Sequence, residues 1–571
     1  MIKNYIYKFN DVLDDKFLFI IIIITILLSI IKINLLPISL TIDSYGYVEY
    51  SENLFPVSAW QSRPIGYAIF LKVARLIPFF GLTLVIFFQI LLYIFASVFI
   101  YLTFRKYNSL IAFIFTLIFS FTPAFQWINI NILADALYTF LPIFVVFYLF
   151  KYFDNQKNSY LYLIFFLAFI VALNRPSYLV FFYIIIFINI FFFFFKKNIN
   201  NFNISKFFLL KLTILSFLFL SLFNIINSNF SKNYAFHQLW IWNISTSMCG
   251  EEKCFNINNG VHAKKYFDVL PEIISTDKYF KEVLSSKYDY KDSPLSIDES
   301  LYKLKPDELL KKIHLSTRHT PFVHIYGFMV NNIGFEETHK IIRNASIETF
   351  LNHPSLIFVN ILSLYKFKNF FNTDIKKSSQ VFKEGLYFGM LPKPHKTLKK
   401  QGLTHFEKIS PKEYSQYIFG LERFTGETFK NYYKNDKKFY ELYKKMDNYT
   451  FVKEKYYEDK NYAFISLYFL AYMNLFFLIF YKVFILIILP IYSVILLVNL
   501  IIKRSYSEKD FVYFFSLLIF YSIIVANLIL SPNNMDKKIL MNLTTLFPLI
   551  IIFTIDIFER FTKKFKIQTD S

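Results

Sequence analysis

Apolar residues occur in this chain as long uninterrupted blocks, and polar residues gather between the blocks. A helix of about 20 apolar residues crosses the hydrocarbon core of a bilayer. Blocks of roughly that length cover residues 17–36, 82–104, 109–124, 131–150, 159–174, 176–195, 207–226, 482–502, 511–530 and 539–558. This pattern predicts a mainly α protein, a polytopic bundle of about ten transmembrane helices. An interfacial helix over 461–480 fits that count, whereas two spans within 461–502 would give eleven.

The positive residues of the short loops predict the orientation. Lysine and arginine collect in the cytoplasmic loops of membrane proteins. The loops around 105–106, 151–157 and 196–197 carry such residues and fall on the same side as the N-terminus. We therefore expect a multi-pass protein of the cytoplasmic (inner) membrane with both termini cytoplasmic. The loops 37–65, 125–130 and 174–176 would then lie outside.

The long polar stretch 228–460 divides the chain into three parts. Residues 1–227 form an N-terminal transmembrane module, whose loop over 37–78 lies outside, and 461–571 form a C-terminal one. Residues 228–460 form an extracytoplasmic domain. Helical periodicity over 301–315 and 339–362 favours an α-rich domain. The second stretch has the pattern of a helical hairpin broken around His353-Pro354.

The charge balance fits a membrane protein. The 571 residues include 62 Lys and Arg against 41 Asp and Glu, a formal net charge of +21, and only 18% are charged. Soluble domains carry about 25% charged residues. A basic excess in a soluble protein suggests nucleic acid, but here cytoplasmic loops and lipid head groups account for it. Membrane lipids are expected partners, and nucleic acid is not.

Ionisable residues near the membrane gather at the outer ends of the predicted spans. They are Asp43, Arg63, Asp135, Arg175 and the pair Lys537-Lys538. A transporter should carry such residues in mid-span, and here almost none occur. Two acids and several cations that meet in an outer cleft favour chemistry on a phosphorylated lipid. Simpler roles remain open, namely helix caps for the two acids and an interfacial anchor for Arg175.

The two cysteines, Cys249 and Cys254, lie in the motif MCGEEKC of the outer domain. A C-x4-C spacing allows a local disulfide in an oxidising compartment. Two free thiols are the alternative.

Four short motifs resemble a known family. The first outer loop has an acid just after the first span, Asp43, and then RPIGYAIFL at 63–71, with Tyr47 and Gln61 between them. NILADALYTFLPIF at 131–144, LNRPSYLVFF at 173–182 and NASIETFLNHPSLIF at 344–358 follow. Together they resemble the polytopic glycosyltransferases of the GT-C class, such as dolichyl-phosphate-mannose protein mannosyltransferases and lipid A aminoarabinose transferases. The chain departs from this family in two places. It has a single acid, Asp43, before Ser44, and its last outer loop reads NNMDKK at 533–538.

The resemblance implies an activity. Such enzymes move a sugar, with inversion, from a polyprenyl-phosphate carrier to an acceptor outside the cytoplasmic membrane, and the acceptor is a glycan, a lipid or a protein. Asp43 is then the candidate base, and Asp135 either orients the sugar or binds a divalent cation. The candidate donor-binding residues, several of which would meet the phosphate charge, are Tyr47, Gln61, Arg63, Arg175, Lys537 and Lys538.

Two other function classes fit the same layout. One is a polymerase or ligase that handles pyrophosphate-linked glycans, and the other is a non-catalytic transporter or assembly protein. The first class relies on arginines in its outer loops, and the outer domain holds only Arg318, Arg343 and Arg423. The chain has no P-loop or dinucleotide fingerprint, so soluble nucleotides are not expected as an energy source.

Overall fold

The architecture is taken from a computed structural model. It describes residues 2–35, 47, 50–51, 54, 64–76, 81–122, 125, 128–129, 132–195, 206–230, 257–266, 268, 329, 333–355, 476–477, 479–503, 508–530 and 544–559. These residues are helical or lie in turns, and no strand occurs among them. The predicted mainly α class is confirmed for this part of the chain.

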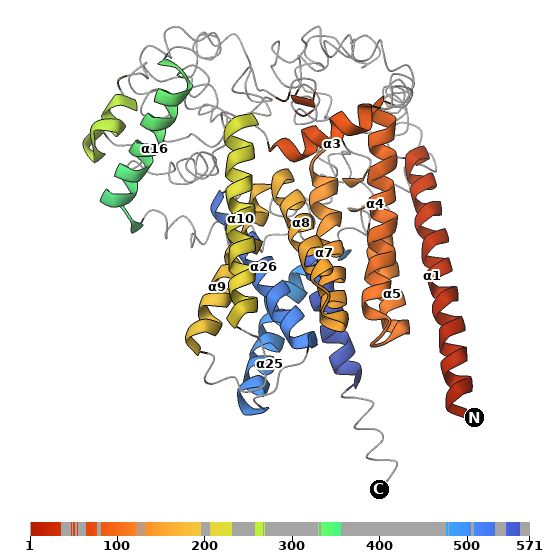
Figure 1. The fold of residues 1–571 in the computed structure, drawn as a ribbon. Helices are drawn as coiled ribbons and strands as arrows, with labels where there is room; N and C mark the ends of the chain where they lie inside the picture. Colours follow the sequence, from red (N-terminus) through yellow and green to blue (C-terminus); the bar gives the residue numbers. More distant parts are fainter. Residues whose placement is uncertain are drawn as a thin grey trace.

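The helices follow one another up and down through a bundle (Figure 1). The first group consists of α1 (Ile2–Leu35), α3 (Ile65–Arg75), α4 (Gly81–Phe104), α5 (Ser109–Phe121), α7 (Asp135–Asn155), α8 (Asn158–Asn174), the 3-10 turn η2 (Pro176–Leu179), α9 (Val180–Phe195) and α10 (Lys206–Phe230). The second group consists of η4 (Ile257–Asn259), α16 (Phe335–Asn352), the π-helical turn η10 (Phe484–Ile488), α25 (Leu489–Lys503), α26 (Glu508–Leu530) and a last helix over 544–559.

Several helices suit a bilayer. Within the described ranges, four are long and apolar enough to cross a membrane, namely Leu84–Phe104, Asp135–Asn155, Leu209–Ile226 and Ile479–Val498. Shorter apolar helices cover Ser109–Phe121, Asn158–Asn174, Pro176–Ile190 and Tyr513–Ile524. Together they indicate a multi-pass membrane protein, as the apolar blocks predicted.

Helix α7 lies at the centre of the bundle because it is apolar on nearly every side. It packs against α4, α8 and α26. Aromatic rings fill much of the α4–α7 contact, for example Phe99 stacked on Phe147 at 4.4 Å between ring centroids. Phe182 of α9 and Phe219 of α10 make a similar stacked contact at 5.9 Å. Aromatic side chains therefore hold the helices together through many such contacts.

The two ends of the bundle are called proximal and distal. The proximal end is where α1 begins, and the turns at 105–108 and 156–157 lie there. At this end the Asn108 side chain caps α5 by accepting a hydrogen bond from the Ile111 amide at 2.9 Å. The distal end is where α7 begins, α8 ends and α3 crosses the bundle (Figure 1).

Most of the described residues in the 228–460 stretch belong to a small helical unit. Glu348 of α16 accepts hydrogen bonds from the amides of His262 and Ala263, which lie in the first turn of a short helix after η4. A carboxylate suits a helix N-terminus because the amides there lack partners within the helix. Helix α16 ends at Asn352, directly before His353-Pro354, where the sequence predicted a break. The predicted second arm and the periodic stretch 301–315 lie outside the described residues.

Candidate functional site

Helix α3 packs directly against the backbone of α8 at the distal end. Gly66 permits this, because a Cβ atom there would lie 2.7 Å from the carbonyl carbon and oxygen of Leu173. Real Cβ contacts are essentially never that short, so any residue other than glycine would force the two backbones apart. The contact brings the RPIGY motif, through Tyr67, beside the end of α8, where Arg175 follows. Two motifs that are far apart in the sequence thus meet at one place.

Asp135 and Arg175 form an ion pair at this place. The carboxylate Oδ1 accepts a hydrogen bond from Nη2 of the guanidinium group. The Asp135 side chain is only 3% exposed and the Arg175 side chain 34% exposed. Asp135 lies in the first turn of α7, where the helix dipole also favours a negative charge. Ala134, not Asp135, occupies the cap position, so the carboxylate is directed to Arg175 and not to capping.

The Tyr138 ring of α7 lies against the guanidinium group. The Arg175 Cζ atom lies 5.4 Å from the centroid of the Tyr138 ring, within range of a cation–π interaction. The Tyr138 hydroxyl accepts a hydrogen bond from Ser177 Oγ at 3.3 Å, and its ring meets Tyr178 edge to face. These contacts fix the direction of Arg175 from the side of η2.

Tyr67 interacts electrostatically with Asp135 and belongs to a short chain of hydrogen bonds. The Tyr67 hydroxyl donates a hydrogen bond to Gln89 Oε1 at 2.7 Å, and Gln89 Nε2 donates to the carbonyl of Asn129 at 2.9 Å. The Tyr47 ring packs edge-on against Tyr67 with 5.1 Å between centroids. Burial, and then the neighbouring Tyr47 and Asp135, raise the pKa of Tyr67 well above its ordinary value. Tyr67 therefore remains a neutral donor.

Arg175 keeps its positive charge. Burial alone would lower its pKa, but Asp135, Tyr47 and Tyr138 raise it above the ordinary value of an arginine. Its Nε atom is buried and has no hydrogen-bond partner in the described part of the chain. Asp135 engages Nη2, and the guanidinium group carries further donors. Arginine suits the oxygens of a phosphate because of its planar array of donors.

The structure brings together three of the predicted site residues: Asp135, Arg175 and Tyr47. The others lie outside the described residues; they are Asp43, Gln61, Arg63, Lys537, Lys538, Cys249 and Cys254. No group of three His, Cys, Asp or Glu side chains that could hold a metal ion occurs among the described residues.

Three residues of interest were missed in the sequence. Gln89 is an isolated polar residue within an apolar block, and Tyr67 follows the glycine of RPIGY. Lys482 is only 5% exposed, next to Tyr481, whose hydroxyl lies 3.2 Å from Thr122 Oγ1. An isolated polar or charged residue in an apolar span is itself a signal of function. That rule, applied residue by residue, would have selected Gln89 and Lys482.

No protein-family model, curated protein or solved structure matches this chain. The resemblance to GT-C glycosyltransferases thus rests on the short motifs alone.

Proposed function

We propose that this protein is a membrane glycosyltransferase that moves a sugar from a polyprenyl-phosphate carrier to an acceptor outside the cytoplasmic membrane. The observation that carries the proposal is the ion pair between the buried Asp135 and the half-buried Arg175 at the distal end. It joins two of the motifs behind the GT-C resemblance, and α3, from a third, packs beside it. A fixed guanidinium group with unused donors is what a departing phosphate needs.

The positive loops support the orientation that this function needs. The turns at 105–108 and 156–157 lie at the proximal end, and their basic residues favour the cytoplasm. In this proposal the distal end faces outward. The lipid carrier then reaches the site from the outer leaflet, with its phosphate at the level of Arg175.

The reaction is a direct displacement. Asp43 takes the proton from the acceptor hydroxyl while its oxygen attacks the anomeric carbon of the sugar. The bond between that carbon and the phosphate oxygen breaks, and polyprenyl phosphate leaves with the electron pair. Arg175, with Arg63 and Lys537 or Lys538, stabilises the phosphate charge. Asp135 holds Arg175 in place, and inversion follows from attack opposite the leaving group.

The test measures free polyprenyl phosphate released from polyprenyl-phosphate hexoses in native-membrane vesicles. Wild type is compared with Asp43→Asn, with Lys72→Ala and with vesicles that lack the protein. Lys72 is exposed on the outer-loop helix α3, so its loss controls for a charge change in the same loop. We expect release by wild type and Lys72→Ala and none by Asp43→Asn. Release by Asp43→Asn at the wild-type rate would exclude Asp43 as the base. Absence of release with every donor would favour the pyrophosphate-linked ligase or a non-catalytic role.

Accessibility labelling tests the orientation separately. A single cysteine replaces Asp43 in a chain whose Cys249 and Cys254 are serines. A membrane-impermeant maleimide added to intact cells should label it. Labelling only after the cytoplasmic side is opened would contradict the proposed orientation.

A further inference from the structure

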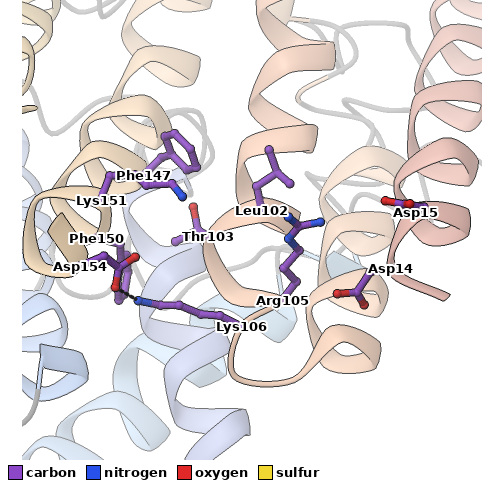
Figure 2. Close-up of a pocket in the computed structure, with 10 residues that line it drawn as sticks. All are labelled: Asp14, Asp15, Leu102, Thr103, Arg105, Lys106, Phe147, Phe150, Lys151 and Asp154. Carbon is purple, nitrogen blue, oxygen red and sulfur yellow. Dashed lines mark hydrogen bonds and ion pairs between the residues drawn. The ribbon is translucent and has the colours of Figure 1, made fainter. Parts of the chain in front are cut away.

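A cavity of about 600 Å³ opens at the proximal end of the bundle, at the opposite end from Asp135 and Arg175. Its walls come from α1, from the end of α4 with the following turn, and from α7. Figure 2 shows the α1 side chains on one side and the α7 side chains on the other, with Arg105 between them. The volume falls within the roughly 300–1,000 Å³ typical of small-molecule sites.

The charged side chains that line the cavity balance. They are Asp14, Asp15 and Asp154 against Arg105, Lys106 and Lys151. Two of these six charges are already paired, because Lys106 Nζ lies 2.7 Å from Asp154 Oδ1. Lys106 also lies over the Phe150 ring at 5.1 Å from its centroid. This pair closes one side of the cavity.

The four remaining charges do not pair with one another. Within the described residues, Arg105 and Lys151 have no carboxylate within 4.0 Å, and Asp14 and Asp15 have no cation within that distance. Asp14 accepts a hydrogen bond from the Tyr101 hydroxyl at 3.2 Å, which fixes the end of α4 against α1. The cavity thus has two unpaired cations toward α4 and α7, and two unpaired acids on α1.

The cavity also has an apolar wall. Leu102, Phe147 and Phe150 line it beside the charged groups. Phe147 is 8% exposed and Phe150 is 2% exposed, so both belong to the packed core and give the wall a fixed shape. A site for a small soluble anion has no need of such a wall. A phospholipid has both parts, a charged head group and an apolar glycerol ester region.

We propose that this cavity binds the phosphoethanolamine head group of a membrane phospholipid. The phosphate lies against Arg105 and Lys151, and the ammonium group donates to Asp14 and Asp15. Equal numbers of unpaired cations and acids match a zwitterion, whereas an anionic head group would face two uncompensated carboxylates. A choline head group lacks the N–H donors that the carboxylates require. The site is separate from the proposed transfer reaction and does not depend on it.

The test counts lipids that remain bound to the full chain. The purified protein is placed in detergent with equal amounts of phosphatidylethanolamine, phosphatidylglycerol and phosphatidylcholine, and native mass spectrometry identifies the lipids retained. Wild type should retain phosphatidylethanolamine in preference to both others. Preference for phosphatidylglycerol or no preference would overturn the proposal.

Two paired variants sharpen the result. Arg105→Gln/Lys151→Gln should lower phosphatidylethanolamine retention about tenfold or more. The control Lys16→Gln/Lys157→Gln removes the same charge from exposed residues at the same end that do not line the cavity. It should retain the lipid as wild type does, and an equal loss in both variants would refute a specific site.

An acid variant and a soluble competitor complete the test. Asp14→Asn/Asp15→Asn should shift the preference toward phosphatidylglycerol, because the negative side of the site is lost. An unchanged preference would contradict the assigned role of the two acids. Glycerophosphoethanolamine should displace the lipid only at far higher concentration. Displacement at the concentration of the lipid itself would assign the site to a soluble phosphoethanolamine compound and overturn the lipid proposal.

Discussion

Replacement of Gly66 by alanine tests the contact on which the distal site depends. The added Cβ would lie 2.7 Å from the carbonyl carbon and oxygen of Leu173 and 3.0 Å from the amide nitrogen of Asn174. All three are backbone atoms, so no side-chain rotation relieves the clash. Ordinary contacts begin at 3.4 Å, and α3 and α8 must therefore separate by at least about 0.7 Å.

Two effects of opposite sign decide the stability of Gly66→Ala. Alanine is favoured over glycine inside a helix by about 0.8–1.0 kcal/mol. Overpacking of a close contact costs about 1–3 kcal/mol. The clash outweighs the helix preference, and we expect a net loss of stability of up to about 2 kcal/mol. A larger effect is expected on transfer, because the shifted backbone leads directly into Arg175 and misplacement by about 1 Å can lower a rate by roughly 100-fold.

The assay combines the apparent melting temperature in detergent with release of polyprenyl phosphate in vesicles. Val73→Ala is the control, since Val73 lies on the same helix and is 57% exposed. It should leave both quantities near wild type, whereas Gly66→Ala should lower both. If Gly66→Ala melts at or above the wild-type temperature and keeps its activity, helix preference alone has acted. The close approach of α3 to α8 would then be refuted.

Two further predictions concern the pair and a helix cap. Arg175→Gln should lower the stability of the protein by about 3 kcal/mol, because it leaves the Asp135 carboxylate, which is 3% exposed, without its partner. Asp135→Asn should cost less, because the Arg175 side chain that it leaves unpaired is 34% exposed. The melting temperature of the double variant, Asp135→Asn/Arg175→Gln, should fall no further than that of Arg175→Gln alone. A fall equal to the sum of the two single variants would show that the two residues act independently. Asn108→Ala should cost about 1 kcal/mol because the acceptor for the Ile111 amide is lost. Asn108→Asp should melt as wild type does, and both Asn108 variants should keep transfer activity. An equal loss of melting temperature in the two variants would contradict the role of Asn108 as a cap.

The helices themselves were predictable from the sequence because burial in lipid leaves a local signal. A run of apolar residues must satisfy its backbone groups internally, and a helix does so within the run. The ends of the helices were less predictable. Residues 132–134 form a turn before α7 begins at Asp135, although the apolar block starts at 131. Helix α1 extends back to Ile2 through a polar stretch that the block did not include.

The candidate site was predictable only in part. Asp135 and Arg175 were selected because charges at the ends of spans are costly and therefore informative. Their pairing was not predictable, since it depends on how α7 and η2 pack. Gln89 was missed because the rule for isolated polar residues in apolar spans was applied only to charged side chains, and the hydrogen bond from Tyr67 to Gln89 joins two separate helices.

The sequence by itself determined the helical class and the apolar segments, since these depend on residues close together in the chain. It also identified the charged residues at the span ends. Only the tertiary structure decided that Gly66 meets the backbone of Leu173, that Asp135 holds Arg175, and that acids of α1 face cations of α7 and of the turn after α4 across a cavity. Each of these contacts joins separate helices, and helix packing depends on shape complementarity over whole surfaces, which no local pattern encodes.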